Sequence, residues 1–570
     1  MATTAAPQLA GHLLVRCLIE QGVSHVFGVP GESFLAALDG FHEHAEQIRF
    51  VPNRQEGGAA YMAEAVGKLT GRPGVCFVTR GPGATNACIG VHTAFQDSTP
   101  MVVLIGDVAR DARDREAFQE VDFSAMFGPL AKSVQRIDDP ERIPEYVQRA
   151  FATALNGRPG PAVLVLPEDM LTMPALAQPL PRVEPVRGGV EPEPLAELLA
   201  RLRRAHQPLV LLGGGGWSAK ACQDMESFAH RWGLPVACAF RFQDLFDNRD
   251  DHYVGDVGLG VAPHLAAAVR NADMLLVVGA RLGESTSSGY TLVPVGAPRD
   301  GLVHVHADPE ELYRVYTPSL AINSGMPAMA AALAQSEPPQ SCAWEGWRRE
   351  LRRAFEQHGN PASSRRDAPG DVDMFAIMEH VRAHLPGDAI CTNGAGNFAT
   401  WLHRFYPLPG WASGQRTQLA PTNGSMGYGV PAGVAASMVS GRPVLTFTGD
   451  GDFLMNAQEL ATATAMGARM VIVLVNNAMY GTIRMHQERE FPARLAGSSL
   501  HNPDFVGLAR AYGLGASRVT RTDQFAQAWS EAWNAPGSYL IELVIDPQVI
   551  TPKATLNDIR QASLKALKPS

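Results

Sequence analysis

Two polar motifs follow apolar segments near the C-terminal end of the chain. Gly449-Asp450-Gly451 comes directly after the apolar segment Val444–Thr448, and Asn476-Asn477 ends another such segment. Glycines allow a backbone to turn sharply and to approach a diphosphate closely, and the N–H groups of a following helix face an anion. Mg²⁺ prefers oxygen ligands and often combines a carboxylate with phosphate oxygens. These residue types therefore suit a metal-bound diphosphate.

We predict a Mg²⁺–diphosphate site at these two motifs. Its metal ligands are expected to be the carboxylate of Asp450, the amide oxygen of Asn477 and the backbone carbonyl of Met479. Each motif alone is also compatible with an ordinary turn or loop. The two together, each at the end of an apolar strand, favour the metal site.

The elements that must position such a site are typical of α/β domains. Short apolar segments alternate with segments of helical length, which indicates parallel sheets flanked by helices. The predicted strands are Ser24–Gly28, Gly74–Thr79, Met101–Gly106, Ala162–Leu166, Pro208–Leu212, Val236–Ala239, Met274–Gly279, Leu302–His306, Ala389–Thr392, Pro443–Thr448, Met470–Val475 and Tyr539–Val544.

Two segments with little periodicity divide these strands into three blocks. Pro174–Pro194 contains six prolines and is typical of a linker. The second, 336–371, contains one amphipathic helical stretch around Trp344–Phe355. We therefore predict an α/β fold with three Rossmann-like parallel-sheet domains, at residues 1–175, 190–340 and 370–550, and a C-terminal tail at 551–570.

Length, charge and cysteine content exclude several classes of protein. A chain of 570 residues is too long for one core. The net charge of −9, without a long basic run, argues against nucleic-acid binding. Seven scattered cysteines, none spaced as CxxC, indicate a reducing compartment rather than a disulfide framework or zinc site. No apolar run approaches the length of a membrane span, and no signal sequence is visible, so we expect a cytoplasmic protein.

Further motifs follow one another along the chain. They are Gly28-Val29-Pro30-Gly31, Arg54-Gln55-Glu56, Gly81-Pro82-Gly83-Ala84-Thr85-Asn86, Asp97-Ser98-Thr99-Pro100, Ala117-Phe118-Gln119-Glu120, Gly157-Arg158-Pro159-Gly160-Pro161 and Asn502-Pro503-Asp504-Phe505. With the two polar motifs above, they resemble the thiamine-diphosphate-dependent superfamily of acetolactate synthase and benzoylformate decarboxylase. The resemblance covers nearly the whole chain and is closest to acetolactate synthase large subunits.

The resemblance implies a pyrimidine-binding domain, a central domain and a diphosphate-binding domain, with thiamine diphosphate and Mg²⁺ as cofactors. It also implies a homodimer or homotetramer, because in that family the first and last domains of two subunits sandwich each cofactor. No nucleic acid or membrane partner is expected.

The same resemblance assigns roles to individual residues. Glu56 matches the glutamate that hydrogen-bonds the aminopyrimidine ring and promotes the tautomer that removes the thiazolium C2 proton. A carboxyl group in a poorly solvated pocket has a raised pKa, which suits this proton sharing. Met426 is expected beneath the bent cofactor, and the Gly424 carbonyl is expected to accept from its amino group. The remaining cofactor-binding residues are predicted to be Gly396, Asn397, Gly449, Asp450, Gly451, Asp452, Asn477, Met479 and Tyr480.

Three residues depart from the acetolactate synthase pattern. Arg80 stands where that family has a small polar residue, and it is either a clamp for a substrate carboxylate or a member of a structural ion pair. His486 replaces a tryptophan and is either an acid/base group or an exposed helical histidine. Glu32 follows the Pro30-Gly31 turn, at a position that contacts substrate in some relatives.

A small set of residues is predicted to contact the substrate. Phe118, Gln119 and Lys132 match positions that line the acetolactate synthase site. The predicted catalytic residues are Glu56, Arg80, Phe118, Gln119 and His486.

The central domain leaves the question of a flavin open. Gly213–Gly216 after a predicted strand fits a dinucleotide-type turn, and Gly279-Ala280-Arg281 matches the start of a segment near the flavin of acetolactate synthases. The residues after Arg281 and the segment Gly258–Val261 do not match. FAD, an ADP-like nucleotide and an empty site therefore remain alternatives.

The favoured function is a carboligase or lyase of 2-oxo acids. Decarboxylation of one 2-oxo acid would be followed by transfer of the acyl anion equivalent to a carbonyl acceptor. The alternatives are a 2-oxo acid decarboxylase or hydroxyacyl lyase that forms no acetolactate, and a flavin-dependent oxidase of the same superfamily. A structural paralogue without activity is disfavoured because Glu56, Asp450 and Asn477 are all present.

Overall fold

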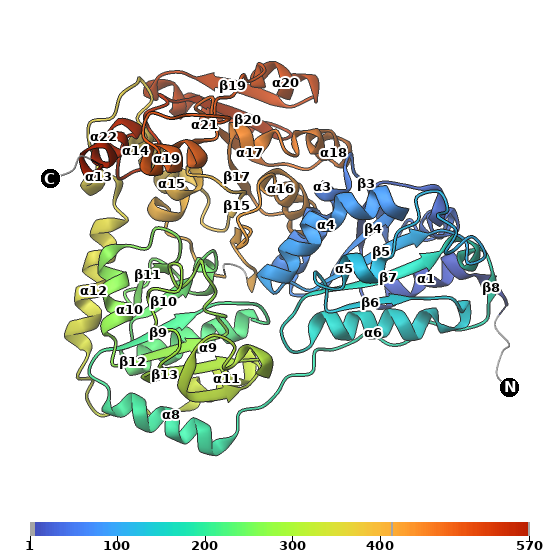
Figure 1. Cartoon of the computed structure of the whole chain (residues 1–570), viewed down its shortest axis with the longest axis horizontal. Coiled ribbons are helices and arrows are strands. Elements are labelled where there is room, and N and C mark those ends of the chain that lie inside the picture. The colour runs from blue at the N-terminus through green and yellow to red at the C-terminus, as the bar shows by residue number, and fades with distance from the viewer. Residues whose placement is uncertain (1–5, 412–413, 568–570) are drawn as a thin grey trace. The chain divides into compact units, whose positions relative to one another are not determined.

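The chain folds into two compact units in this computed structural model, which describes residues 6–411 and 414–567. The N-terminal unit is Met1–Arg187 and the C-terminal unit is Gly188–Ser570. Together they contain three six-stranded sheets whose strands are all parallel (Figure 1). The predicted fold class, α/β with three Rossmann-like parallel sheets, is confirmed.

The N-terminal unit contains one of these sheets, in the order β3-β2-β4-β5-β7-β6. Its strands are β2 (His25–Gly28), β3 (Arg49–Pro52), β4 (Gly74–Thr79), β5 (Met101–Asp107), β6 (Ser133–Arg136) and β7 (Pro161–Pro167). Its helices are α1 (Ala10–Glu20), η1 (Glu32–Phe34), α2 (Leu35–Glu43), α3 (Glu56–Thr70), α4 (Arg80–Asp97), α5 (Phe123–Phe127), η2 (Pro140–Arg142), α6 (Ile143–Leu155) and α7 (Glu168–Leu171). A short antiparallel pair, β1 (Gln8–Leu9) with β8 (Pro174–Ala175), joins the two ends of the unit.

The C-terminal unit begins with the central sheet, in the order β11-β10-β9-β12-β13-β14. Its strands are β9 (Pro208–Leu212), β10 (Val236–Ala239), β11 (Tyr253–Val257), β12 (Met274–Val278), β13 (Pro298–His306) and β14 (Thr317–Asn323). The helices of this region are α8 (Pro192–Arg204), α9 (Ala219–Trp232), η3 (Gln243–Leu245), α10 (Pro263–Asn271), η4 (Pro309–Glu311), α11 (Met326–Gln335), α12 (Glu345–His358) and α13 (Pro361–Ser364).

The same unit contains the C-terminal sheet, in the order β16-β15-β17-β18-β20-β19. Its strands are β15 (Ile390–Asn393), β16 (Gln418–Leu419), β17 (Val444–Gly449), β18 (Val471–Asn476), β19 (Gly515–Val519) and β20 (Tyr539–Val544). Its helices are α14 (Met374–His384), α15 (Phe398–Phe405), α16 (Gly429–Ser440), α17 (Asp450–Phe453), η6 (Ala457–Glu459), α18 (Leu460–Met466), α19 (Gly481–Glu490), α20 (Phe505–Ala511), η7 (Thr522–Gln524), α21 (Phe525–Asn534) and α22 (Leu556–Ala566).

Burial on both faces explains why the inner strands form. Every residue of β5 and of β7 is buried, because helices cover both faces of a parallel sheet and favour continuous apolar segments. Each predicted strand corresponds to an inner strand of one of the three sheets. The prediction omitted both edge strands of every sheet.

The two predicted linkers contain regular structure at their borders or within them. Pro174–Pro194 begins with β8 and ends inside α8, so its irregular part is shorter than expected. The second segment contains the predicted amphipathic helix, α12, whose Leu351 joins the core beside the central sheet. The predicted tail contains α22, and its last residues, 568–570, lie outside the described residues.

A buried polar network joins the central and C-terminal sheets within their unit. The Arg416 guanidinium donates to the Asp244 carboxylate through Nε at 3.0 Å and Nη2 at 2.6 Å. The backbone N–H groups of Thr417 and Gln418 donate to the same carboxylate. Both charged side chains are buried, so each neutralises the charge of the other. The bidentate geometry also holds the two sheet regions in a defined relative position. None of the described helices is long and apolar enough to cross a membrane.

Candidate cofactor site

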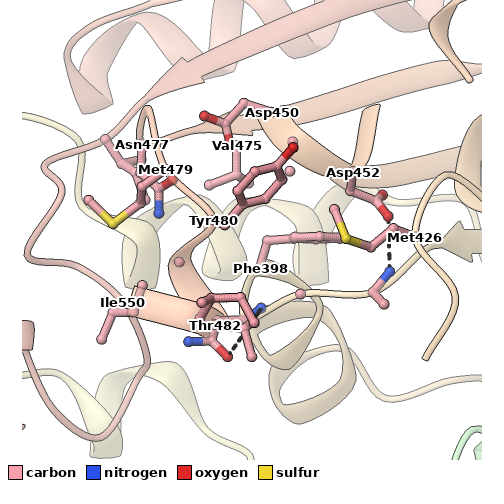
Figure 2. A pocket seen from close by; sticks show the side chains of 18 of the residues that line it. Phe398, Met426, Asp450, Asp452, Val475, Asn477, Met479, Tyr480, Thr482 and Ile550 are labelled. Carbon is pink, nitrogen blue, oxygen red and sulfur yellow. Dashed lines mark hydrogen bonds between the residues drawn. The ribbon is translucent and has the colours of Figure 1, made fainter. Parts of the chain in front are cut away.

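A pocket lies at the carboxyl ends of the C-terminal sheet, where β15, β17 and β18 end. Ligands of open α/β sheets bind at such ends, where the strand order reverses. Chain segments after these three strands form much of its wall (Figure 2). The pocket is lined by all of the predicted cofactor-binding residues of this unit: Gly396, Asn397, Gly424, Met426, Gly449, Asp450, Gly451, Asp452, Asn477, Met479 and Tyr480.

Asp450 is a buried carboxylate at the end of β17. The side-chain amide of Asn502 donates to its Oδ2 at 2.7 Å and also to Oδ1 of Asn476 at 2.9 Å. Burial raises the pKa of Asp450 above its usual range, while the hydrogen bond from Asn502 favours the ionised form. Because Asn502 donates to both Asp450 and Asn476, it connects the carboxylate to the segment that carries Asn477.

The donor set fits a divalent cation. Figure 2 shows Asp450, Asn477 and Met479 around the same side of the pocket. Asp450 is 3% exposed, yet no Lys, Arg or His side chain within residues 6–411 and 414–567 forms an ion pair with it. A buried carboxylate without a positive partner is costly, and oxygen ligands suit Mg²⁺. The residues present are therefore compatible with the predicted metal.

Asp452 holds together three chain segments at the pocket wall. Its Oδ1 accepts from the backbone N–H groups of Gly427 (2.9 Å) and Ala395 (3.0 Å), and its Oδ2 accepts from the Thr448 hydroxyl at 2.7 Å. Burial raises the pKa of Asp452 to about 6, against the lowering effect of these bonds. Gly394 is required beside it, because an added Cβ would lie 2.0 Å from Asp452 Oδ1.

Met426 and Gly424 lie on a turn next to this carboxylate. Gly424 has a φ of +70°, a conformation that favours glycine. The Met426 side chain points into the pocket beside Asp452 (Figure 2). An unbranched thioether suits an irregular cavity, and the place of Met426 beneath a bent cofactor stays a prediction.

Asn397 is tied to α19 at another wall of the pocket. The Thr482 hydroxyl accepts from the Asn397 backbone N–H at 3.0 Å and donates to its side-chain oxygen at 3.1 Å. Tyr480 lies close to Gly451, where an added Cβ would lie 2.7 Å from the tyrosine ring. These contacts place Tyr480 directly against the glycine turn that follows β17.

Glu56 lies in the N-terminal unit, at the first position of α3. The side-chain amide of Asn86 donates to its Oε2 at 2.9 Å. Asn86 belongs to the Gly81–Asn86 motif, so this motif positions the predicted catalytic carboxyl group. Gly83 of the same motif lies beside this carboxyl group, since a Cβ added there would be 3.5 Å from Glu56 Oε1, an ordinary contact distance.

Arg80 forms the ion pair that was one of its two predicted roles. Its Nη2 lies 2.5 Å from Oε2 of Glu168, and its side chain is 10% exposed. Arg80 adopts a φ of +40° at the start of α4, a strained conformation for a long side chain. The ion pair holds the guanidinium beside Glu168, the first residue of α7.

Phe118 and Gln119 lie on the loop between β5 and α5. Phe118 is 75% exposed. The backbone carbonyl of Gln119 accepts from the Gly81 N–H at 2.9 Å, so the loop contacts the start of α4. Lys132 donates to the carbonyls of Thr153 (2.5 Å) and Asn156 (2.6 Å) at the C-terminal end of α6.

His486 and Glu32 are both exposed. His486 lies on α19, the helix whose first turn contributes Thr482 and Ile483 to the pocket, but His486 does not line the pocket. Glu32 begins η1, directly after the Pro30-Gly31 turn.

The glycine turn of the central sheet lies at the carboxyl ends of β9 and β12. An added Cβ at Gly214 would lie 2.1 Å from the Gly279 carbonyl oxygen, and both glycines have φ above +60°. The Gly213 carbonyl accepts from Trp217 Nε1 at 2.8 Å. The two segments singled out by sequence therefore meet at one place in the fold.

Sequence reasoning missed several lining residues. Asn502 was recognised only as part of a motif, although it hydrogen-bonds Asp450. Phe398, Thr482, Val549 and Ile550 also line the pocket. They follow no local pattern, and only the position of Phe398 shortly after β15 offered a signal.

Three family models match successive parts of the chain. "Thiamine pyrophosphate enzyme, N-terminal TPP binding domain" matches residues 9–126. "Thiamine pyrophosphate enzyme, central domain" matches 195–333, and "Thiamine pyrophosphate enzyme, C-terminal TPP binding domain" matches 394–543.

Curated relatives match over almost the full length. The chain is 31% identical to an acetolactate synthase large subunit of Parasynechococcus marenigrum, over 93% of this chain and 86% of the relative. It is 31% identical to the acetolactate synthase isozyme 2 large subunit of Escherichia coli, over 94% and 95%. It is 29% identical to acetolactate synthase 1, chloroplastic, of Nicotiana tabacum, over 95% and 82%.

Proposed function

Because this chain belongs to the thiamine pyrophosphate enzyme family, we propose that it is an acetolactate synthase-like carboligase of 2-oxo acids. The observation that carries the proposal is the pocket lined by Asp450, Asn477 and Met426, in a chain that matches acetolactate synthase large subunits over most of its length.

The cofactors of the proposed enzyme are thiamine diphosphate and Mg²⁺. Asp450, Asn477 and the Met479 carbonyl would hold the metal, and the glycine turn at Gly449–Gly451 would face the diphosphate. When bound, thiamine diphosphate would supply a nucleophilic carbon and an electron sink for the pair that CO₂ leaves behind.

The chain's own residues would orient the cofactor and move its protons. Met426 would support the rings from below, and the Gly424 carbonyl would accept from the pyrimidine amino group. Glu56 would share a proton with the pyrimidine ring, and the hydrogen bond from Asn86 holds its Oε2. Asp452 would keep the wall behind Met426 in place through its bonds to Gly427 and Ala395.

Carboligation is favoured over simple decarboxylation by the substrate-facing residues. Phe118 and Gln119 match acetolactate synthase positions, and the exposed Phe118 ring is available for contact with a ligand or another surface. Arg80 is held by Glu168, so we assign it to the support of this region. His486, which is exposed outside the pocket, remains a candidate acid/base group.

The decisive experiment is pyruvate turnover by the full-length protein with thiamine diphosphate and Mg²⁺. Pyruvate loss and acetolactate formation are followed together. Stoichiometric acetolactate supports the carboligase. Free acetaldehyde without acetolactate would mean a decarboxylase, and pyruvate-dependent oxygen consumption would mean a flavin-dependent oxidase. No turnover with the cofactor bound would mean a different donor, to be sought among other 2-oxo acids and acyl-CoA compounds.

The nucleotide of the central region and the oligomeric state are part of the same proposal. Three alternatives remain for the turn at Gly213–Gly216: FAD, an ADP-like nucleotide, or no nucleotide. The absorption spectrum detects a flavin, and analysis of the nucleotide released on denaturation separates the other two. We propose a homodimer or homotetramer with active sites between subunits, to be measured by sedimentation.

A further inference from the structure

A second cluster of metal-ligand side chains lies beside the central sheet. It consists of His230, Asp250 and His252, whose ligand atoms all lie within 4.8 Å of one another. Asp250 Oδ2 is 2.6 Å from His230 Nε2, and its Oδ1 is 3.0 Å from His252 Nδ1. The two imidazole ring centroids are 4.6 Å apart. None of these residues lines the cofactor pocket.

The cluster lies at the amino ends of the strands. His230 is in the last turn of α9, the helix that leads from the carboxyl end of β9 back to the start of β10. Asp250 and His252 directly precede β11, the edge strand of this sheet. Substrates and nucleotides bind at the opposite, carboxyl ends. The cluster is thus separate in the fold from the glycine turn at Gly213–Gly216.

The backbone that carries Asp250 and His252 is held in place by buried polar contacts. The Asn248 side-chain amide donates to the carbonyls of Gln243 (2.8 Å) and Phe246 (2.9 Å). The Arg352 guanidinium donates to the carbonyls of Asn248 and Tyr253, both at 3.0 Å. A metal site needs ligands on rigid elements, and this segment and α9 provide them.

The ligand set has the chemistry of a transition-metal site. Two imidazole nitrogens and one carboxylate oxygen suit Zn²⁺, with water in the remaining position. The side chains of His230, Asp250 and His252 are 51%, 22% and 15% exposed, so an ion can enter from solvent.

The charges around Asp250 also favour a cation. Within the described part of the chain, the ion-pair partners of Asp250 are the two histidines. The neighbouring Arg249 instead forms a bidentate pair with Asp247, through Nε at 2.9 Å and Nη2 at 2.6 Å. Among the described residues, no Lys or Arg side chain thus forms an ion pair with Asp250.

We propose that His230, Asp250 and His252 bind one Zn²⁺ ion, which ties the C-terminal end of α9 to the edge strand β11. The site is structural: an ion that binds only the folded protein stabilises it in proportion to its affinity and concentration. Its position and ligands make it independent of the Mg²⁺ site at Asp450 and of the proposed reaction.

The test is zinc titration of the full-length protein. Transition metals are removed with a chelator, and thiamine diphosphate and excess Mg²⁺ are then restored so that the oxygen-rich site is occupied. Calorimetric titration with ZnCl₂ should show one equivalent bound per chain. The melting temperature should rise with zinc, and bound Co²⁺ should give the visible bands of a site with nitrogen ligands.

The variants His230→Ala and His252→Ala should each weaken zinc binding by more than about tenfold, because each loses one of three ligands. Asp250→Asn should weaken it as well. His206→Ala is the matched control: His206 lies 3.6 Å from Asp273 but belongs to no group of three ligand side chains among the described residues. This control should bind zinc like the wild type.

Equal zinc affinity in the wild type and a His230→Ala/His252→Ala double variant would overturn the proposal. So would the absence of a one-equivalent phase in the wild type. Zinc-free melting temperatures of the variants establish that they fold, and His230→Ala serves if the double variant does not, because the His230 side chain is half exposed.

Discussion

At the scale of single residues, the proposed cofactor chemistry depends on two carboxyl groups with different surroundings. Glu56 begins α3 and receives a hydrogen bond from Asn86. Asp450 is buried at the end of β17 and receives a hydrogen bond from Asn502. In the proposed enzyme, the first shares a proton with the cofactor and the second is a ligand of the cation.

Glu56→Gln should bind the cofactor but lose turnover by a factor of at least about 100, because the amide cannot exchange a proton with the pyrimidine ring. Cofactor affinity and kcat are measured separately, by fluorescence titration and pyruvate turnover. Glu46→Gln, an exposed acid of the same unit, should leave both unchanged. Near-normal kcat in Glu56→Gln would refute the assigned role.

Asp450→Ala should weaken Mg²⁺-dependent retention of thiamine diphosphate by more than about tenfold, because it removes a charged metal ligand. Asn502→Ala should give a smaller loss, since it removes only the hydrogen bond that orients this carboxylate. Retention is measured after gel filtration at fixed Mg²⁺, with the exposed Asp523→Asn as control. Unchanged retention in Asp450→Ala would mean that the metal binds elsewhere.

At the scale of elements, burial decides which strands a sequence reveals. Most inner strands contain a buried, mainly apolar run, and each inner strand was predicted. The edge strands were not: β6 is half-buried throughout, only two of the five residues of β19 are buried, and β16 has only two residues. An edge strand faces solvent along one side and keeps polar residues, so its sequence lacks the apolar run that marks a buried strand.

Strand β13 contains a histidine that should make the central region sensitive to acid. His304 is 2% exposed, and its Nε2 donates to the Ala280 carbonyl at 2.8 Å. Burial lowers the pKa of His304 to about 4, below its ordinary value of 6.5. The histidine therefore binds a proton more readily in the unfolded chain than in the folded one. The contribution of neutral His304 to the free energy of unfolding is complete above pH 6.5 and is lost as the pH falls toward 4.

His304→Gln should reduce this loss, because the amide can still donate to Ala280 but does not titrate. Between pH 7.5 and pH 4.5, the free energy of unfolding of the wild type should fall further than that of the variant. The two decreases should differ by on the order of 3 kcal/mol. Melting temperatures at both pH values check it, with the exposed His206→Gln as control. An identical pH dependence of wild type and His304→Gln would contradict the assignment.

An ion pair and apolar contacts connect helix α22 to α19. The Arg560 guanidinium forms two hydrogen bonds with the buried Glu488 carboxylate, one of them from Nε at 2.8 Å. Arg560→Ala should destabilise this contact by about 1–3 kcal/mol, since it leaves Glu488 without its cation. Faster proteolysis at α22 is the measurement.

A double variant, Glu488→Leu/Arg560→Met, is the control for this pair. It removes both charges and should recover most of the protease resistance. If Arg560→Ala is cleaved no faster than the wild type, α22 is held by its apolar contacts, through Leu556 and Ile559, rather than by the ion pair.

At the scale of the whole molecule, the predicted site residues are divided between the two units. Glu56 lies in Met1–Arg187, and the proposed metal ligands lie in Gly188–Ser570. The resemblance to acetolactate synthase implies that two subunits provide one site. Two inactive variants with defects in different units can test this implication.

Glu56→Gln and Asp450→Ala, mixed and allowed to exchange subunits, should regain activity. In a mixed dimer, one site would combine the intact Glu56 of one subunit with the intact Asp450 of the other. Statistical mixing should restore about a quarter of wild-type activity, since about half of the dimers are mixed and each has one intact site of two. Each variant alone is the control. No recovery despite demonstrated subunit exchange would place both residues in the same subunit's site.

The sequence by itself determined the class of fold and the kind of cofactor site. Inner strands are visible as apolar runs, and the motifs at Asp450 and Asn477 follow directly from two of them, so neighbouring strands bring them together without further information. The glycines that turn the chain there are equally local. These features require only residue type and short-range order.

The tertiary structure alone decided the contacts between residues far apart in the chain. It joined Arg80 to Glu168, Asn502 to Asp450, and Asp452 to the backbone at Ala395 and Gly427. It also gathered His230, Asp250 and His252. Such contacts depend on which loops come together in the folded chain. Neither the periodicity of the sequence nor a local motif predicts this.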